Sequence, residues 1–196
     1  MANTSTWEPL AAEELVDLLA GVQTPWWLAG GVALDLFVGH PTRHHHDLDV
    51  EIPRAGLDAL IGHLRGWDPH TAHNAALRRL HNAAEQPQEA NGVWWRREPT
   101  TPWCLDLKLA HVVAGEWLYR RCPAIRRPLA SLWWTSPGGL PVIAPEVQLL
   151  FKARIDRTTD TDDASAVVPL LDIQARRWLI DAIRLAHPES PWLDWL

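Results

Sequence analysis

The apolar residues in the first part of the chain predict three short elements. Between residues 10 and 22 they recur every three or four positions, which is typical of an amphipathic helix. A short strand is predicted over residues 25–29. It runs into Gly30 and Gly31, and the apolar run over residues 32–37 then predicts a short buried helix.

A strict alternation follows over residues 46–52, with the sequence HDLDVEI. In a strand, Asp47, Asp49 and Glu51 would share one face, and the three aliphatic residues between them would share the other. The pattern therefore predicts a strand with one face in the core and one acidic face. A crossover helix is predicted next, over residues 54–64, whereas residues 67–92 show no clear pattern.

A second alternating segment, WCLDLKL over residues 103–109, places Asp106 on the polar face of a strand. Together with residues 94–97 it predicts a hairpin. Beyond the Pro-Gly-Gly turn at residues 137–139, helices are predicted over residues 145–157, 160–170 and 172–186. We therefore expect an α/β (α+β) fold with a mixed sheet flanked by helices. A catalytic core over residues 1–140 would be joined to a helical subdomain over residues 141–196 that closes the active-site cleft.

Composition narrows the class of protein. The chain has 196 residues and a formal net charge of −6, which argues against a broad surface for nucleic acid. No apolar run reaches the roughly 20 residues of a spanning helix, and residues 1–22 lack the pattern of a secretory signal. We expect a cytoplasmic protein without membrane contact, with Cys104 and Cys122 reduced.

Two further residue types are interpreted structurally. The 13 tryptophans are expected to pack in the core and at its rim. Three arginine pairs, at residues 96–97, 120–121 and 126–127, are interpreted as solvated arginines. The histidine run at residues 44–46 does not predict a zinc site, because adjacent side chains on an extended chain point in alternate directions.

The carboxylates carry the candidate chemistry. Asp47 and Asp49, two residues apart on a strand, would point to one site, where two Mg²⁺ ions would relieve their repulsion. Asp106 is the candidate for the third carboxylate, which would bind one metal ion and take the proton of an attacking hydroxyl. Its alternative role is a salt bridge with Lys108 or an arginine.

The glycine pair adds a candidate phosphate site. Gly30 and Gly31 precede a short helix, so their backbone N–H groups could approach an anionic phosphate with the help of the helix dipole. The sequence contains no Walker-type loop and no Gly-x-Gly-x-x-Gly fingerprint, which excludes the commoner nucleotide-binding plans.

Residues 26–51, WWLAGGVALDLFVGHPTRHHHDLDVE, resemble the nucleotidyltransferase superfamily, and in particular its aminoglycoside and lincosamide branch. Arg43, His45, Asp47 and Asp49 occupy the branch's Gly-Gly…Arg-x-His-x-Asp-x-Asp pattern. The resemblance implies that the two aspartates bind magnesium and that the glycine pair lies against the triphosphate. Arg43 and His45 are included as nucleotide-site candidates, although Arg43 could instead pair with Asp35 or Glu51, and His45 could orient the loop or an aspartate.

The resemblance extends to the second half of the chain. Residues 103–109 resemble the third-carboxylate strand, which gives Asp106 that role by position. In residues 140–163, Lys152 falls on a lysine expected to touch phosphate. Thr159 departs from the pattern, since related sequences tend to carry lysine there.

The function expected from this resemblance is magnesium-dependent transfer of AMP from ATP, or of another nucleoside monophosphate from its triphosphate, to an acceptor hydroxyl. A small cationic acceptor such as an aminoglycoside is compatible with the acidic chain, and several acids, Glu98, Asp160, Asp162 and Asp163, are candidates to meet it. Two alternatives stay open. One is a toxin-like nucleotidyltransferase that modifies tRNA or protein, and the other is a nucleotide-binding module without catalysis.

Overall fold

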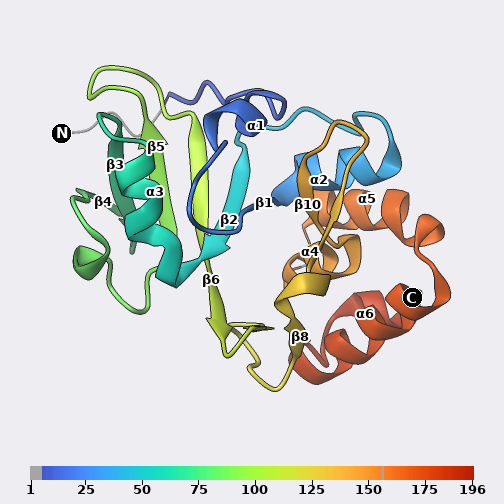
Figure 1. Cartoon of the computed structure of the whole chain (residues 1–196). Helices are drawn as coiled ribbons and strands as arrows, with labels where there is room; N and C mark the ends of the chain where they lie inside the picture. The colour runs from blue at the N-terminus through green and yellow to red at the C-terminus, as the bar shows by residue number, and fades with distance from the viewer. Residues whose placement is uncertain (1–5, 156) are drawn as a thin grey trace.

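In the computed structural model, which describes residues 6–155 and 157–196, the chain forms a mixed sheet with helices on its flanks (Figure 1). The strand order is β4-β3-β5-β6-β2-β1-β10-β9, and β7 pairs with both β6 and β8. The strands are β1 (Trp27–Leu28), β2 (Asp49–Pro53), β3 (Asp68–His73), β4 (Ala76–Arg79), β5 (Gly92–Arg96), β6 (Leu105–Val113), β7 (Glu116–Leu118), β8 (Arg126–Pro128), β9 (Trp133–Thr135) and β10 (Pro141–Ile143). The expected α/β class with a mixed sheet is confirmed.

The helices gather mainly beside the β1–β10 half of the sheet (Figure 1). They are α1 (Glu14–Leu18), α2 (Gly30–Val38), α3 (Leu57–His63), α4 (Pro145–Lys152), α5 (Thr158–Val167) and α6 (Ile173–Ala186). Contacts join α2 to α4 and α5, and α4 to α6. Within the described ranges, no helix has the length and apolar character needed to cross a membrane.

The centre of the sheet is the parallel pair β2 and β6. Asp49 lies opposite Asp106, and Val50 lies opposite Leu107 in the same register. Val50 and Leu107 are fully buried, as the alternation predicts. Two strands that start at the same edge therefore bring two carboxylates to one place in the fold.

Most of the large aromatic side chains are core residues. Trp27, Trp95, Trp103, Trp117 and Trp192 are almost completely buried. The ring of Trp27 is stacked on that of Trp133, with 5.3 Å between centroids and 6° between planes. The interpretation of the tryptophans as packing residues holds for these positions.

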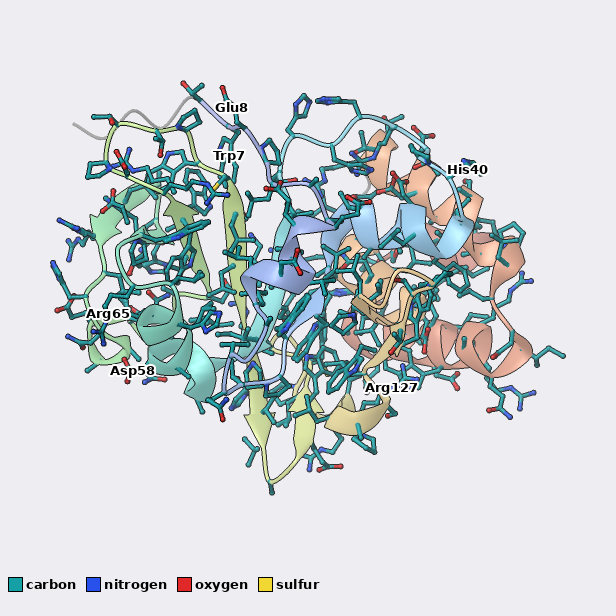
Figure 2. The ribbon with its side chains drawn as sticks, turned by 45° about the horizontal axis from the view of Figure 1, so that its top comes forward. Trp7, Glu8, His40, Asp58, Arg65 and Arg127 are labelled. Atoms are coloured by element: carbon teal, nitrogen blue, oxygen red, sulfur yellow. The ribbon has the colours of Figure 1, made fainter. Side chains whose placement is uncertain are left out.

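Contacts fasten the segment around Trp7 and the strand β8 to this core. Trp7 and Glu8 lie beside the sheet (Figure 2), where the N–H of Glu8 donates to the carbonyl of Trp103 at 2.9 Å. On the opposite side of the molecule Arg127, labelled in the same view, pairs with Glu146 of α4 and so ties β8 to the helical half.

Several predicted boundaries differ from the structure. The first helix is only α1, five residues long, because positive φ at Gly21 and turns at its C-terminal end replace the last predicted turn. Residues 46–48 are not part of the strand, so Asp47 lies on the segment that leads into β2 instead of on it. Residues 67–92, which showed no pattern, contain β3 and β4. The predicted hairpin is confirmed as the antiparallel pair β5 and β6.

In the C-terminal part, the helix predicted over residues 145–157 is interrupted. It ends at Lys152, and α5 starts at Thr158; Asp156 lies outside the described residues. The last predicted helix is confirmed as α6, where the side chain of Asp172 caps the N-terminus by accepting from the N–H of Ala175.

Truncating the side chain at the centre of the sheet tests this core. Leu107→Ala removes a fully buried side chain, and we expect the free energy of unfolding to fall by about 2 to 5 kcal/mol. Leu185→Ala, at a position 58% exposed on α6, is the control and should leave it nearly unchanged. Urea denaturation of both variants measures the difference. Equal unfolding midpoints for Leu107→Ala and Leu185→Ala would contradict the placement of Leu107 in the core.

Candidate active site

The three predicted carboxylates converge. One oxygen from each of Asp47, Asp49 and Asp106 lies within 4.8 Å of the others. Asp106 is buried, Asp49 is partly buried and Asp47 is exposed, so the cluster opens to solvent on the Asp47 side. The β2–β6 register supplies the inner two groups, and the lead-in to β2 supplies the third.

Lys108 partly neutralises the cluster. Its Nζ lies 2.6 Å from Oδ2 of Asp106 and 3.5 Å from Oδ1 of Asp49. Burial raises the pKa of Asp106 to about 6, and the charge of Asp49 adds to this rise while Lys108 opposes it. Burial likewise raises the pKa of Asp49. The salt bridge considered as an alternative for Asp106 therefore exists, and it occurs inside the carboxylate cluster.

The cluster fits a divalent cation by its donor set. Three carboxylates face one lysine, so negative charge remains in excess. Oδ1 of Asp106 is buried and has no hydrogen-bond partner among the described residues. A buried carboxylate oxygen without a partner is costly, and hard oxygen donors are the ligands that Mg²⁺ prefers.

The glycine pair is required by close packing of neighbouring side chains. Gly30 starts α2 with φ +74°, and a Cβ there would overlap the carboxylate of Asp49. A Cβ on Gly31 would overlap the ring of His45 and the guanidinium of Arg43. The N–H of Gly30 donates to Oε1 of Gln148 at 2.9 Å, so this amide already has a partner from α4.

Arg43 and His45 lie over the start of α2, where each has an acidic partner. Arg43 donates twice to Asp163 of α5, at 2.9 and 3.0 Å, and this pairing raises the pKa of the arginine. The partner is thus neither Asp35 nor Glu51, because the loop reaches α5 instead. Nε2 of His45 lies 2.7 Å from Oδ2 of Asp35, consistent with the expectation that His45 orients the loop or an aspartate.

Lys152 is buried within an ion-pair network. Its Nζ lies 2.8 Å from Asp160 and 2.8 Å from Asp163. Asp160 and Asp163 are also buried, so they do not present exposed charge to a cationic acceptor. Asp162 is exposed on α5, as is Thr159.

The sequence does not predict Gln148 as a site residue, and it indicates Asp163 only as a candidate to meet a cationic acceptor, not as a partner of Arg43 and Lys152. Gln148 holds the amide of Gly30, and Asp163 links Arg43 to Lys152. The sequence indicates Gln148 only weakly, because it is a polar residue within the apolar run VQLLF. It does not indicate the pairing of Asp163, because the partners of Asp163 are distant in sequence.

Two cavities flank the carboxylates. One, of about 280 Å³, is lined by Gly30, Asp49, Lys108, Gln148 and the arginine pair 120–121, among others. The other, of about 860 Å³, is lined by Asp47 and much of the loop at residues 39–48, and also by the segment at residues 9–16, α2 and the turn at residues 136–140. The cluster is therefore accessible from two sides.

The comparisons with known proteins agree with this geometry. A family model described as aminoglycoside-2''-adenylyltransferase matches residues 12–86. The solution structure of the antibiotic-resistance factor ANT(2'')-Ia matches with a TM-score of 0.55 at 16% identity, covering 87% of this chain and 88% of that one. The crystal structure of the lincosamide antibiotic adenylyltransferase LnuA with bound lincomycin matches with a TM-score of 0.56 at 18% identity, covering 83% and 99%.

The fold is that of a nucleotidyltransferase. ANT(2'')-Ia in complex with adenylyl-2''-tobramycin also matches, with a TM-score of 0.50 at 16% identity over 86% of this chain and 92% of that one. No curated protein sequence matches the chain. The resemblance to the antibiotic-modifying branch is confirmed, and the family match indicates an enzyme of the nucleotidyltransferase class.

The packing of Asp49 against Gly30 can be separated from backbone strain. Both Gly30 and Gly39 have positive φ, but a Cβ on Gly39 would meet nothing within 4 Å. Gly39→Ala should cost about 1 to 2 kcal/mol of stability from the left-handed backbone alone. Gly30→Ala should cost more, because its methyl group must displace Asp49. Equal losses in thermal unfolding would show that the Asp49 side chain yields freely.

A structural contribution of Lys152 is also measurable. Lys152→Met removes charged contacts to the buried Asp160 and Asp163, and we expect a loss of about 2 kcal/mol in the free energy of unfolding. Arg184→Met, which breaks an exposed 3.5 Å contact to Asp181, serves as the control and should change stability little. If Lys152→Met were as stable as wild type, the ion-pair network would not contribute to folding.

Proposed function

We propose that this protein is a magnesium-dependent adenylyltransferase that transfers AMP from ATP to a hydroxyl group of a small antibiotic-like acceptor. The observation that carries the proposal is the convergence of Asp47, Asp49 and Asp106 beside the N-terminus of α2. The aminoglycoside-2''-adenylyltransferase match over residues 12–86 includes two of these three aspartates and the glycine pair.

The three aspartates would hold two Mg²⁺ ions. When bound, such ions supply charge neutralisation at the reacting phosphate and its leaving group. The buried Asp106 oxygen that lacks a partner is the group best suited to accept the proton of the acceptor hydroxyl. The acceptor oxygen then forms a bond to the α-phosphorus, the bond from that phosphorus to the bridging oxygen breaks, and pyrophosphate leaves.

The remaining candidates would position the nucleotide. Gly30 and Gly31 would support the triphosphate at the start of α2, with Arg43 and His45 covering the same turn. Arg43 and Lys152 both pair with Asp163 of α5. These pairs support a role for the two residues in joining the loop before β2 to α4 and α5 around the site. Direct phosphate contact from Lys152 remains a prediction, and it would require the lysine to leave an acidic partner.

The two parts of the chain would have different roles. Residues 1–140 would form the catalytic core, and residues 141–196 would close the cleft through α4, α5 and α6. β10 joins the two parts by pairing in parallel with β1, so that Val142 lies opposite Leu28.

For the acceptor, the compounds bound in the similar structures suggest which classes to test. LnuA was solved with lincomycin, and ANT(2'')-Ia with an adenylylated tobramycin. We propose an acceptor of one of these two classes. Modification of tRNA, or nucleotide binding without catalysis, is not favoured by the matches.

The decisive assay is transfer of label from each α-labelled nucleoside triphosphate, with Mg²⁺, to aminoglycosides, lincosamides and bulk tRNA. We expect transfer from ATP to an antibiotic, abolished by a chelator and restored by added Mg²⁺. Asp106→Asn should lower kcat by about 100- to 10,000-fold, because the proton acceptor is removed. Asp47→Ala with Asp49→Ala should be inactive.

Asp181→Asn, at an exposed acid of α6 outside the cluster, is the matched control and should keep wild-type activity. Bound nucleotide without any transfer would instead support the binding module. Label on tRNA, lost steeply as salt is raised, would favour the toxin-like enzyme.

A further inference from the structure

The three arginine pairs of the sequence have different surroundings in the fold. Each arginine of two pairs lies near an acid: Arg96 near Asp68, Arg97 near Glu14, Arg126 near Glu116 and Arg127 near Glu146. Neither Arg120 nor Arg121 forms an ion pair with a carboxylate in residues 6–155 or 157–196. The interpretation as solvated arginines is wrong for Arg96, which is buried and paired with Asp68. It holds for Arg120 and Arg121, which are both exposed.

The surroundings of this pair are also positively charged. Arg120 is exposed, but partial burial lowers its pKa, and the charges of Arg121 and Arg154 lower it further. Arg120 in turn helps lower the pKa of Arg54, after burial. In a chain with a net charge of −6, this is a local excess of positive charge that an anion would relieve.

The position of the pair links it to the carboxylates. Arg120 and Arg121 follow β7 in the extension formed by β6, β7 and β8 (Figure 1). Both line the 280 Å³ cavity that also contains Gly30 and Asp49 in its wall. The lining of this cavity therefore includes a candidate metal ligand, Asp49, together with the two arginines.

Arg121 is held in place by an aromatic cluster. Its Nη1 donates to the hydroxyl of Tyr119 at 3.1 Å, and that hydroxyl lies 2.8 Å from Nε2 of His187. The guanidinium also lies 5.8 Å from the ring centroid of Phe151. Such contacts reduce the entropy lost when the arginine binds an anion.

Three other cations near the carboxylates already have acidic partners. Lys108 contacts Asp106 and Asp49, Lys152 contacts Asp160 and Asp163, and Arg43 is bound to Asp163. A triphosphate entering the same cavity needs cationic donors beyond the metal ions. Arg120 and Arg121 can supply them without breaking an ion pair.

We propose that Arg120 and Arg121 form a phosphate-binding subsite for the terminal phosphates of the nucleotide, and hence for the pyrophosphate product. A guanidinium group matches this ligand because its planar N–H donors can bind two phosphate oxygens together. The assignment rests on the proposed function for the source of the anion, since the reaction consumes a triphosphate.

The test is isothermal titration calorimetry of the full chain with Mg²⁺ and one of three probes: inorganic pyrophosphate, α,β-methylene ATP or AMP. For Arg120→Ala with Arg121→Ala we expect pyrophosphate and the ATP analogue to bind about 10- to 100-fold more weakly. AMP, which lacks the terminal phosphates, should bind as it does to wild type. Arg78→Ala with Arg177→Ala removes the same charge from exposed positions on β4 and α6 and should change nothing.

Two further variants guard against a folding defect. Arg120→Ala alone leaves the Arg121–Tyr119 contact intact and should still weaken pyrophosphate binding. Arg120→Lys with Arg121→Lys keeps the charge and should recover part of the affinity. Unchanged pyrophosphate affinity in Arg120→Ala, or an equal loss for AMP, overturns the subsite.

Failure of the subsite can be told from failure of the proposed function. If pyrophosphate binding depends on the arginines but the wild-type protein transfers no label, the subsite is supported and the proposed transferase function is overturned. If label is transferred but the KM for ATP is unchanged in the arginine variants, the transferase function is supported and the subsite is overturned. If these variants raised only the KM of the acceptor, the arginines would contact the acceptor and not the nucleotide, and the assignment to the triphosphate would fall.

Discussion

The parallel pairing of β2 with β6 is the constraint on which the rest of the site depends. It fixes Asp49 beside Asp106 in a region where burial raises the pKa of both carboxyl groups. Two like charges so placed oppose folding unless a cation compensates them. Lys108, from the same strand as Asp106, provides one positive charge and leaves one Asp106 oxygen without a partner. In this fold Lys108 therefore neutralises only part of the negative charge of the two carboxylates, and a metal ion can neutralise the rest.

The sequence predicted the parts of the site that depend on local spacing. Alternation in two short segments placed Asp49 and Asp106 on strands with one buried face, and both strands exist. It could not reveal that Asp47 precedes its strand, because the segment that leads into β2 and the strand itself share the same alternation. Pairs between distant segments were also out of reach. Arg43 meets Asp163 across 120 residues, and nothing in either local pattern indicates the partner.

Charge is distributed differently in the two halves of the site. Around α5, each of Arg43, Lys152 and Arg157 pairs with Asp160 or Asp163, so their charges are largely compensated and the pairs join distant segments. Around the β7–β8 connection, the arginines are adjacent to one another and not to acids. The first arrangement contributes stability without a ligand. The second opposes the folded state slightly unless an anion is bound, which is the expected difference between a structural and a binding group.

The spacing of Gly-Gly…Arg-x-His-x-Asp-x-Asp has a steric basis independent of any nucleotide. Gly30 makes room for Asp49, and Gly31 makes room for His45 and Arg43, so the glycines and the later residues pack as one unit. His45 is then held by Asp35 from α2 itself. A substitution at either glycine would move the group that lies over it, and through Asp49 it would move a candidate metal ligand. The glycines therefore matter to the chemistry first by setting the position of a carboxylate, and only then by exposing backbone to phosphate.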